Sequence, residues 1–136
     1  MVVIDDQAMI PRMVKMKMLK HCASAQVEVY RINNTDAHMH FCETVIPDRA
    51  RLWDIVILDQ HMPMDDRPGA IQTGTEMLPV LARYGCNALI VMHTGNTTAK
   101  DIMMYSNAGA HGTISKGTST FIADVLDLYT AHQKQL

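Results

Sequence analysis

The stretch Asp54-Ile55-Val56-Ile57-Leu58-Asp59-Gln60-His61-Met62-Pro63 decides the predicted fold. Its apolar run from Ile55 to Leu58 is mostly β-branched and stops abruptly at the carboxylate of Asp59. Such a run predicts a buried strand, and Pro63 indicates that the chain leaves the strand soon afterwards. We therefore expect this strand to deliver Asp59 to a loop at its end.

The composition indicates a single domain that spans residues 1–136. Twelve basic and fourteen acidic residues give a net charge of -2, and no basic block predicts a nucleic-acid or membrane-surface contact. The cysteines, Cys22, Cys42 and Cys86, are odd in number and lack a C-x-x-C spacing, which favours free, small buried thiols in a reducing compartment. Since no apolar stretch reaches roughly 18 residues, we expect a cytoplasmic protein that does not enter the membrane.

Strand-like and helix-like segments alternate along the chain. Besides the opening stretch, apolar runs predict strands at 1–4, 27–32, 87–93 and 111–115. Helical spacing and capping residues predict helices at 7–22, 35–46, 74–84, 97–107 and from about 118 onward. Turn and cap residues are expected among Asn33, Asn34 and Thr35, at Asn96, and at Thr118 or Ser119, with Pro47 ending the second helix. Residues 62–73 are predicted to form an unusually long connection, of a length that is generally functional or mobile.

This alternation predicts an α/β fold with a parallel sheet. Near-continuous apolar strands imply that helices cover both faces of the sheet through right-handed crossovers. In such a sheet, ligands bind at the carboxyl ends of the strands, beside the point where the strand order reverses. Polar residues follow four of the predicted strands at this edge: Asp5 and Asp6, Asp59, Thr94, and Lys116.

These residues together predict a site for phosphoryl chemistry. Three carboxylates about 4 Å apart would repel by roughly 4 kcal/mol per pair at an effective dielectric near 20. A hard divalent cation with oxygen ligands offsets that repulsion, so we infer Mg²⁺, with Lys116 left to pair with an anion. The hydroxyl of Thr94 can donate to the same anion, and a metal-held carboxylate can act as a nucleophile toward a phosphoryl group.

Each of these residues alone has a simpler interpretation. An aspartate after a strand is most often a helix cap, and a loop threonine or lysine is usually solvated. The simpler interpretation is harder to sustain for the whole set, because four successive strand ends carry the residue types that one phosphoryl-transfer site needs.

The chain resembles the receiver domain of two-component response regulators over essentially its whole length. The motifs that carry the resemblance are Asp5-Asp6, Leu58-Asp59-Gln60-His61-Met62-Pro63, Thr94-Gly95, Ala108-Gly109-Ala110 and Lys116. The resemblance implies a flavodoxin-like (βα)5 doubly wound sheet with strand order 2-1-3-4-5, which is the order the general rule assigns to this type of domain.

The resemblance also implies roles for the site residues. Asp59 would be the phosphoacceptor, and Mg²⁺ would be bound by Asp6, Asp59 and the backbone carbonyl of His61, with Asp5 acting through water. Lys116 would pair with the carboxylate and then with the phosphate, while Thr94 would move toward the phosphoryl oxygens. The phosphate would come from a histidine kinase or a histidine phosphotransfer protein.

The expected partners beyond the phosphate donor are a downstream protein target or a parent hybrid kinase. We expect a monomer or weak dimer, with no output domain after the last helix. The expected chemistry is confined to self-phosphorylation and self-dephosphorylation, so the chain is not predicted to be an enzyme.

Three departures from the family pattern stand out. Gly117 follows the lysine where relatives usually have proline, often with a cis peptide bond. Thr113 stands where switching receivers carry an aromatic residue, and the connection after Pro63 is longer than usual. His61 and Asn96 occupy positions that, in the family, influence removal of the phosphate by water. We hypothesise that His61 affects dephosphorylation; the alternative is a solvent-facing loop histidine.

Three other functions compete with this prediction. A magnesium phosphatase of the aspartyl-phosphate type would want a carboxylate two residues after the nucleophile, where this chain has His61. A flavin or nucleotide binder would want a glycine- or hydroxyl-rich loop after the first strand, but Asp5-Asp6-Gln7 is acidic and would repel phosphate. A non-switching receiver used as a docking module stays open because of Thr113.

Overall fold

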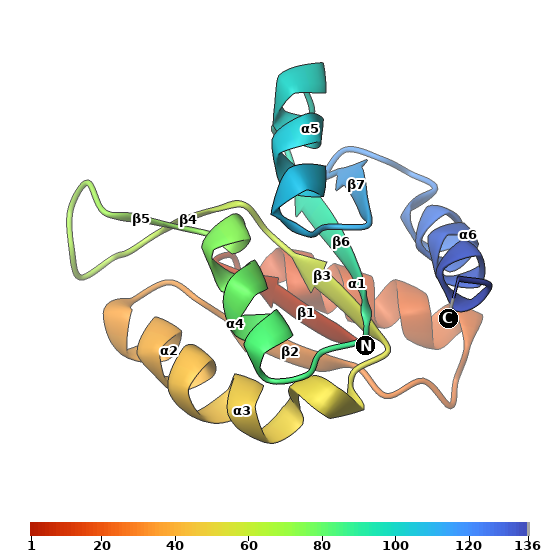
Figure 1. Cartoon of the computed structure of the whole chain (residues 1–136), viewed down its shortest axis with the longest axis horizontal. Coiled ribbons are helices and arrows are strands. Elements are labelled where there is room, and N and C mark those ends of the chain that lie inside the picture. The colour runs from red at the N-terminus through yellow and green to blue at the C-terminus, as the bar shows by residue number, and fades with distance from the viewer. Residues whose placement is uncertain (136) are drawn as a thin grey trace.

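A parallel sheet of five strands forms the centre of the protein. The computed structural model describes residues 1–135, and the strand order is β2-β1-β3-β6-β7. The strands are β1 (Val2–Asp5), β2 (Glu28–Arg31), β3 (Ile55–Leu58), β6 (Leu89–Thr94) and β7 (Gly112–Ser115). The predicted order 2-1-3-4-5 is therefore confirmed, and the opening stretch forms the middle strand (Figure 1).

Helices cover both faces of the sheet, as the apolar strands predict. The helices α1 (Met9–His21) and α6 (Phe121–Gln133) pack on one face, against a cluster that contains Val3, Ile57 and Val91. The other face is covered by α2 (Thr35–His40), α3 (Ile46–Arg49), α4 (Leu78–Arg83) and α5 (Ala99–Ala108). Because successive side chains in a strand point to opposite faces, each central strand contributes to both clusters.

The second predicted helix does not end before Pro47. It continues from α2 through a π-helical turn, η1 (Phe41–Val45), into α3 and a short 3-10 turn, η2 (Ala50–Leu52). Pro47 has no N–H to donate to the carbonyl four residues before it, and its ring clashes with that carbonyl in a regular helix. The wider π turn, in which the Ile46 N–H bonds to the Phe41 carbonyl, lies immediately before the proline and lets the chain continue helically.

The long connection after the middle strand is an ordered hairpin. The strands β4 (His61–Pro63) and β5 (Ile71–Thr73) pair antiparallel and project beside α2 (Figure 1). Met62 and Met64 are buried in the core, and Asp65 and Asp66 bond to the start of α2 at Asn33 and Thr35. A short 3-10 helix, η3 (Gly74–Met77), then leads into α4. The long connection predicted over residues 62–73 therefore contains two short paired strands that the sequence pattern did not predict.

Two of the predicted helix caps need correction. Of the three residues expected to supply the first of these caps, Asn34 caps α2, since its side chain accepts a hydrogen bond from the Ala37 N–H at 2.8 Å. Thr98 caps α5 in place of Asn96, and α6 begins only after Thr120. Asn96 is free for another role because α5 begins later than the sequence pattern predicts.

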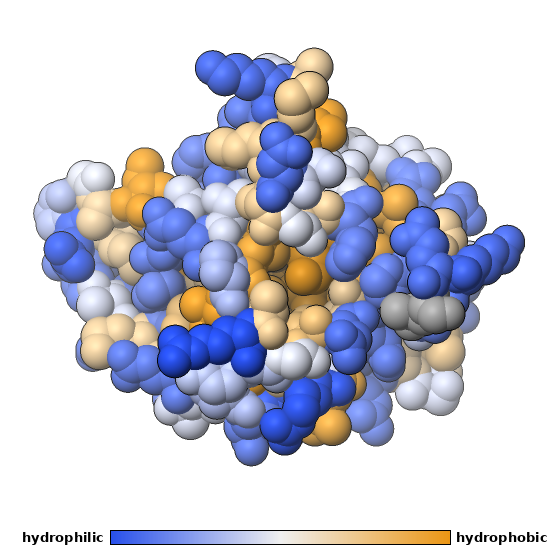
Figure 2. All heavy atoms as spheres, viewed as in Figure 1, coloured by the Kyte–Doolittle hydropathy of each residue, from blue (hydrophilic) through white to orange (hydrophobic). Residues whose placement is uncertain are grey.

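The surface shown in Figure 2 is mostly hydrophilic, with hydrophobic residues visible near its middle.

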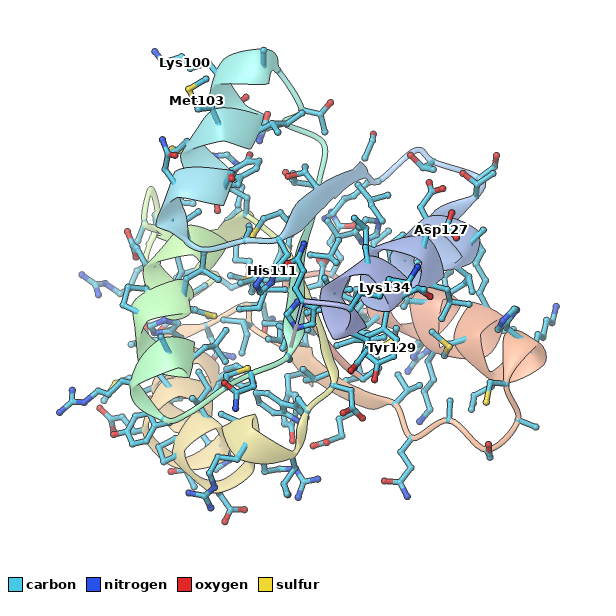
Figure 3. The ribbon with its side chains drawn as sticks, turned by 45° about the vertical axis from the view of Figure 1, so that its right-hand side comes forward. Lys100, Met103, His111, Asp127, Tyr129 and Lys134 are labelled. Atoms are coloured by element: carbon cyan, nitrogen blue, oxygen red, sulfur yellow. The ribbon has the colours of Figure 1, made fainter. Side chains whose placement is uncertain are left out.

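A cavity of about 340 Å³ lies between α4, the end of α5 and α6, and is lined in part by Leu78 and His111. Figure 3 shows His111 beside α6, where its ring lies 4.6 Å from that of His132. Cys22 is exposed, and Cys42 and Cys86 are only half-buried, so the expectation of buried thiols was wrong. No helix within residues 1–135 is both long and apolar enough to cross a membrane.

Candidate functional site

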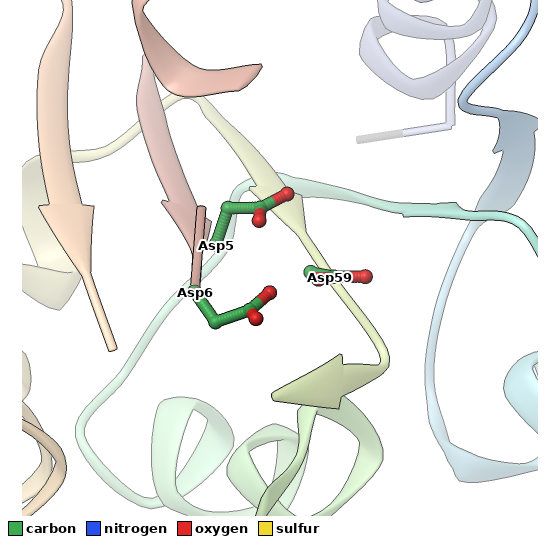
Figure 4. A group of neighbouring side chains, drawn as sticks. All are labelled: Asp5, Asp6 and Asp59. Atoms are coloured by element: carbon green, nitrogen blue, oxygen red, sulfur yellow. The ribbon is translucent and has the colours of Figure 1, made fainter. Parts of the chain in front are cut away.

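Three aspartates converge at the carboxyl edge of the sheet. Asp5 ends β1, Asp6 follows it, and Asp59 follows β3 on the neighbouring strand. Each offers a carboxylate oxygen that lies within 4.8 Å of those of the other two (Figure 4). Asp5 and Asp59 are buried, whereas Asp6 is partly exposed. The strand ends thus bring the predicted carboxylates together.

Lys116 reaches this cluster from the end of β7. Its ammonium nitrogen lies 3.1 Å from Asp5 Oδ2 and 3.0 Å from Asp59 Oδ2. The second contact has the length of a hydrogen bond but not its direction, so Oδ2 of Asp59 has no hydrogen-bond donor within residues 1–135. The cluster therefore has three carboxylates against one ammonium, and one buried carboxylate oxygen is left without a donor.

Backbone groups fix the other oxygens of the two buried carboxylates. The Gln7 N–H donates to Asp5 Oδ1 at 2.9 Å, and the Gln60 N–H donates to Asp59 Oδ1 at 2.8 Å. Arg31 donates to the carbonyl of Asp6 at 3.0 Å, which ties the loop after β1 to the end of β2. These bonds orient the side chains before any ligand binds.

The segment that returns from the hairpin presses against the backbone of Asp59. A Cβ atom at Gly74 would lie 2.1 Å from the Asp59 carbonyl oxygen and 2.9 Å from Leu58 Cγ, so only glycine fits there. Gln60 is buried and bonds through its side chain to Thr75, at 3.0 Å to the N–H and 3.2 Å to Oγ1. The end of the hairpin thus packs against the backbone of the residue that carries the carboxylate.

The burial of these charges shifts their pKa values. Burial, followed by the charge of Asp5, raises the pKa of Asp59 to about 7 despite the opposing contact with Lys116. Burial likewise raises the pKa of Asp5, although the Gln7 N–H and Lys116 act against it. For Lys116, burial acts to lower the pKa, but the two carboxylates outweigh it and raise the value. One ammonium therefore does not fully compensate the carboxylates.

This arrangement fits a hard divalent cation. Clustered carboxylate oxygens are the preferred ligands of Mg²⁺, which also keeps several water molecules and binds phosphate oxygens. Burial and the charge of Asp5 raise the pKa of Asp59 although Lys116 opposes the rise, so a further positive charge would stabilise the ionised carboxylate. The three carboxylates therefore offer oxygen ligands of the kind that Mg²⁺ prefers.

Thr94 and His61 lie beside the cluster but make other contacts. Thr94 ends β6 and is buried, and its hydroxyl accepts a hydrogen bond from the Asn96 N–H at 3.2 Å. His61 begins β4 with an exposed side chain, and its Nδ1 lies 2.7 Å from Asn96 Nδ2. Tyr105, buried on α5, donates from its hydroxyl to the Asn96 carbonyl at 3.0 Å.

Sequence reasoning missed the contacts of Tyr105 with the loop after β6 and of Gly74 with Asp59. Tyr105 fits the apolar spacing of its helix, and nothing local indicates that its hydroxyl reaches the loop after β6. The contact of Gly74 with Asp59 depends on how the hairpin folds back, which the sequence pattern did not predict.

No cis peptide bond occurs within residues 1–135, so the Lys116-Gly117 bond is trans.

Comparison with known proteins places this fold among receiver domains. No protein-family model and no curated protein match the chain. Among solved structures, a response regulator receiver domain protein from Methanospirillum hungatei aligns with a TM-score of 0.68 at 18% identity, covering 99% of this chain and 96% of that one.

Two other solved structures extend the similarity. The BeF3-activated N-terminal receiver domain of Klebsiella pneumoniae RstA aligns with a TM-score of 0.64 at 20% identity, covering 94% of this chain and 95% of that one. The N-terminal domain of a response regulator/sensory box/GGDEF 3-domain protein from Carboxydothermus hydrogenoformans aligns with a TM-score of 0.68 at 13% identity. The alignment covers 98% of this chain and 96% of that one. The chain therefore has the receiver-domain fold.

Proposed function

We propose that this chain is a phosphoacceptor domain of two-component signalling, in which Asp59 receives the phosphoryl group. The observation that carries the proposal is the convergence of Asp5, Asp6 and Asp59 with Lys116 at the carboxyl edge of the sheet. The receiver-domain fold of the solved structures supports it. The domain is a signalling module whose chemistry is confined to gaining and losing its own phosphoryl group.

The reaction begins with attack of an Asp59 carboxylate oxygen on the phosphorus of a phosphohistidine. A P–O bond forms as the P–N bond breaks, and the departing histidine nitrogen retains the electron pair and takes up a proton. The Gln60 N–H holds Oδ1 of Asp59, which orients the carboxylate for the attack. Lys116 then pairs with the phosphoryl oxygens, and later attack of water on phosphorus restores the carboxylate and releases inorganic phosphate.

We assign the Mg²⁺ site to Asp6, Asp59 and the carbonyl of His61, with Asp5 acting through water. When bound, the cation neutralises charge on the carboxylates and on the transferred group. Asp59 must be ionised to attack, and burial beside Asp5 opposes ionisation. Lys116 favours the ionised form, and its position between the two buried carboxylates serves both the free and the phosphorylated state.

We assign Thr94 to the phosphoryl oxygens as a hydrogen-bond donor. Its hydroxyl presently accepts from the Asn96 N–H, which leaves the hydroxyl proton available to an anion. We keep the hypothesis that His61 affects the rate of dephosphorylation, because its ring lies on Asn96 at the edge of the same site. The phosphate donor is a histidine kinase or a phosphotransfer protein, and the output is an altered protein-binding surface.

The test is incubation with a small acyl-phosphate donor and Mg²⁺, followed by intact-mass measurement. We expect wild type to gain one phosphoryl group and Asp59→Asn to gain none. The matched control is Asp54→Asn, which changes an exposed aspartate just before the same strand and is expected to react like wild type. Removing Mg²⁺ with a chelator is expected to abolish the gain in mass.

Two results would contradict this proposal. Equal labelling of wild type and Asp59→Asn would place the phosphoryl group elsewhere. An unlabelled wild type, in the presence of Mg²⁺ and of an authentic phosphohistidine donor, would favour a domain that keeps the site only as a docking module. Steady turnover of an unrelated phosphate ester would favour the phosphatase alternative.

A further inference from the structure

His93 lies in the same row of the sheet as the two buried carboxylates. The parallel register pairs Ile4 with Leu58 and Leu58 with Met92, so one residue further along the strands Asp5, Asp59 and His93 are neighbours. Residues in register on adjacent strands point to the same face, which here is the face covered by α1 and α6. The side chain of His93 therefore lies beside that of Asp59.

The side chain of Lys116 extends across the end of β6 to reach the two carboxylates. Lys116 follows β7, whereas its ion-pair partners lie on β3 and β1, so its stem must pass over the strand that carries His93. His93 and Lys116 both border a cavity of about 40 Å³, which Val14 of α1 and Phe121 of α6 also line. This volume is enough for one water molecule.

The imidazole of His93 is buried without a protein partner. The residue is 6% exposed, its ring packs on Phe121 with centroids 4.6 Å apart, and its Nδ1 has no hydrogen bond within residues 1–135. A buried polar atom without a partner is costly, and such atoms in native proteins usually bond to ordered water. Burial and the nearby charge of Lys116 lower the pKa of His93 to about 4, so the ring is neutral near pH 7.

The ammonium of Lys116 has a hydrogen to spare. An ammonium carries three N–H donors, and the ion-pair contacts with Asp5 and Asp59 engage at most two of them. A water molecule in the cavity can accept from the third N–H and donate to Nδ1 of His93, provided that the ring carries its proton on Nε2.

We propose that His93 is a positioning residue, which holds Lys116 against Asp59 through one water molecule in this cavity. The inference rests on the proposed function for its effect on phosphorylation, but the bridge itself does not depend on that function. Lys116 pairs with the carboxylate before the reaction and with the phosphoryl group afterwards. A polar neighbour that fixes its ammonium therefore acts on the rate of phosphorylation without touching the phosphate donor.

The test compares His93→Leu with His93→Asn. These two side chains have nearly the same shape, but only asparagine offers a hydrogen-bonding atom where Nδ1 lies. We expect His93→Leu to be at least as stable as wild type and yet to accept phosphate from a small acyl-phosphate donor about five-fold more slowly, the size of one neutral hydrogen bond. We expect His93→Asn to recover most of the rate although it is less stable than His93→Leu.

This opposition between stability and rate is the discriminating result. A purely structural role for His93 would make the more stable variant the more active one, or would leave both rates at the wild-type value, and either result would overturn the proposal.

A second measurement tests the bridge between His93 and Lys116 even if the domain accepts no phosphate. In ¹⁵N-lysine-labelled protein, a bridged ammonium of Lys116 exchanges its protons slowly and gives a resolved NMR signal, which Lys116→Met identifies by its loss. The signal is expected in wild type and in His93→Asn but not in His93→Leu. Its presence in all three proteins, or its absence from all three, would overturn the bridge. An unphosphorylated wild type with the expected signals would instead contradict the proposed function alone.

Discussion

Replacing Asp59 by asparagine is expected to stabilise the fold when no divalent cation is present. Asp59 is 3% exposed, and the pKa of its carboxyl is raised from 3.8 to about 7 by burial and by the charge of Asp5. A difference of about three pKa units corresponds to about 4 kcal/mol, at 1.36 kcal/mol per unit, of destabilisation by the ionised form. Because the asparagine amide still has to be buried, we expect a net gain of about 2 to 4 kcal/mol for Asp59→Asn near pH 8.

The sign of the pH dependence follows from proton linkage. Between pH 3.8 and about 7 the folded protein keeps a proton on Asp59 that the unfolded chain has released. The folded state therefore binds more protons, and the contribution of Asp59 to stability falls as the pH rises through this window. The advantage of Asp59→Asn should accordingly be largest above pH 7 and should vanish toward pH 4.

Urea unfolding at pH 4.5, 6 and 8, in a chelator and then in Mg²⁺, measures this effect. Added Mg²⁺ is expected to stabilise wild type far more than Asp59→Asn, because binding to the folded state shifts the equilibrium. The control Asp54→Asn alters an exposed carboxylate near the same strand and should change stability by less than about 0.5 kcal/mol. The reasoning is refuted if Asp59→Asn is no more stable than wild type at pH 8 without divalent cations.

Three further substitutions test the supporting structure. Gly74→Ala should cost more than about 2 kcal/mol of unfolding free energy in urea, because its Cβ would lie 2.1 Å from the Asp59 carbonyl; Gly117→Ala, which meets nothing within 4 Å, is the control, and equal stabilities would contradict the close packing. Asn34→Ala should cost about 1 kcal/mol by thermal unfolding through loss of the α2 cap, whereas Asn34→Asp should cost less. Tyr105→Phe should cost about 1 kcal/mol and speed amide hydrogen exchange in residues 95–98, and unchanged exchange there would refute the bond to Asn96.

The strands and the acidic site were predictable because they depend on local pattern and on one general rule. The run from Ile55 to Leu58 is buried along its whole length, as a β-branched apolar run in a covered sheet must be. Once the strands are parallel, their carboxyl ends share an edge, and Asp5, Asp59 and Lys116 meet there without any knowledge of loop structure.

The remaining features depend on contacts between segments distant in sequence. The two strands of the hairpin were not predicted within the long connection because they are short and include Pro63, although Met62 is fully buried in the core. The cap at Asn96 was wrong because its amide lies on His61, 35 residues away. The position of His93 beside Asp59 follows only from the pairing register, which apolar patterning within one strand does not give.

The central claim is that Asp59 carries the phosphoryl group, and borohydride trapping tests it most directly. An acyl phosphate is reduced by borohydride to the alcohol, so a phosphorylated aspartate becomes homoserine and can be located by peptide mass spectrometry. After incubation with a small acyl-phosphate donor and Mg²⁺, we predict homoserine at position 59 and at no other aspartate. Homoserine at Asp5 or Asp6, or its absence from position 59 in protein that has gained a phosphoryl group, would contradict the assignment.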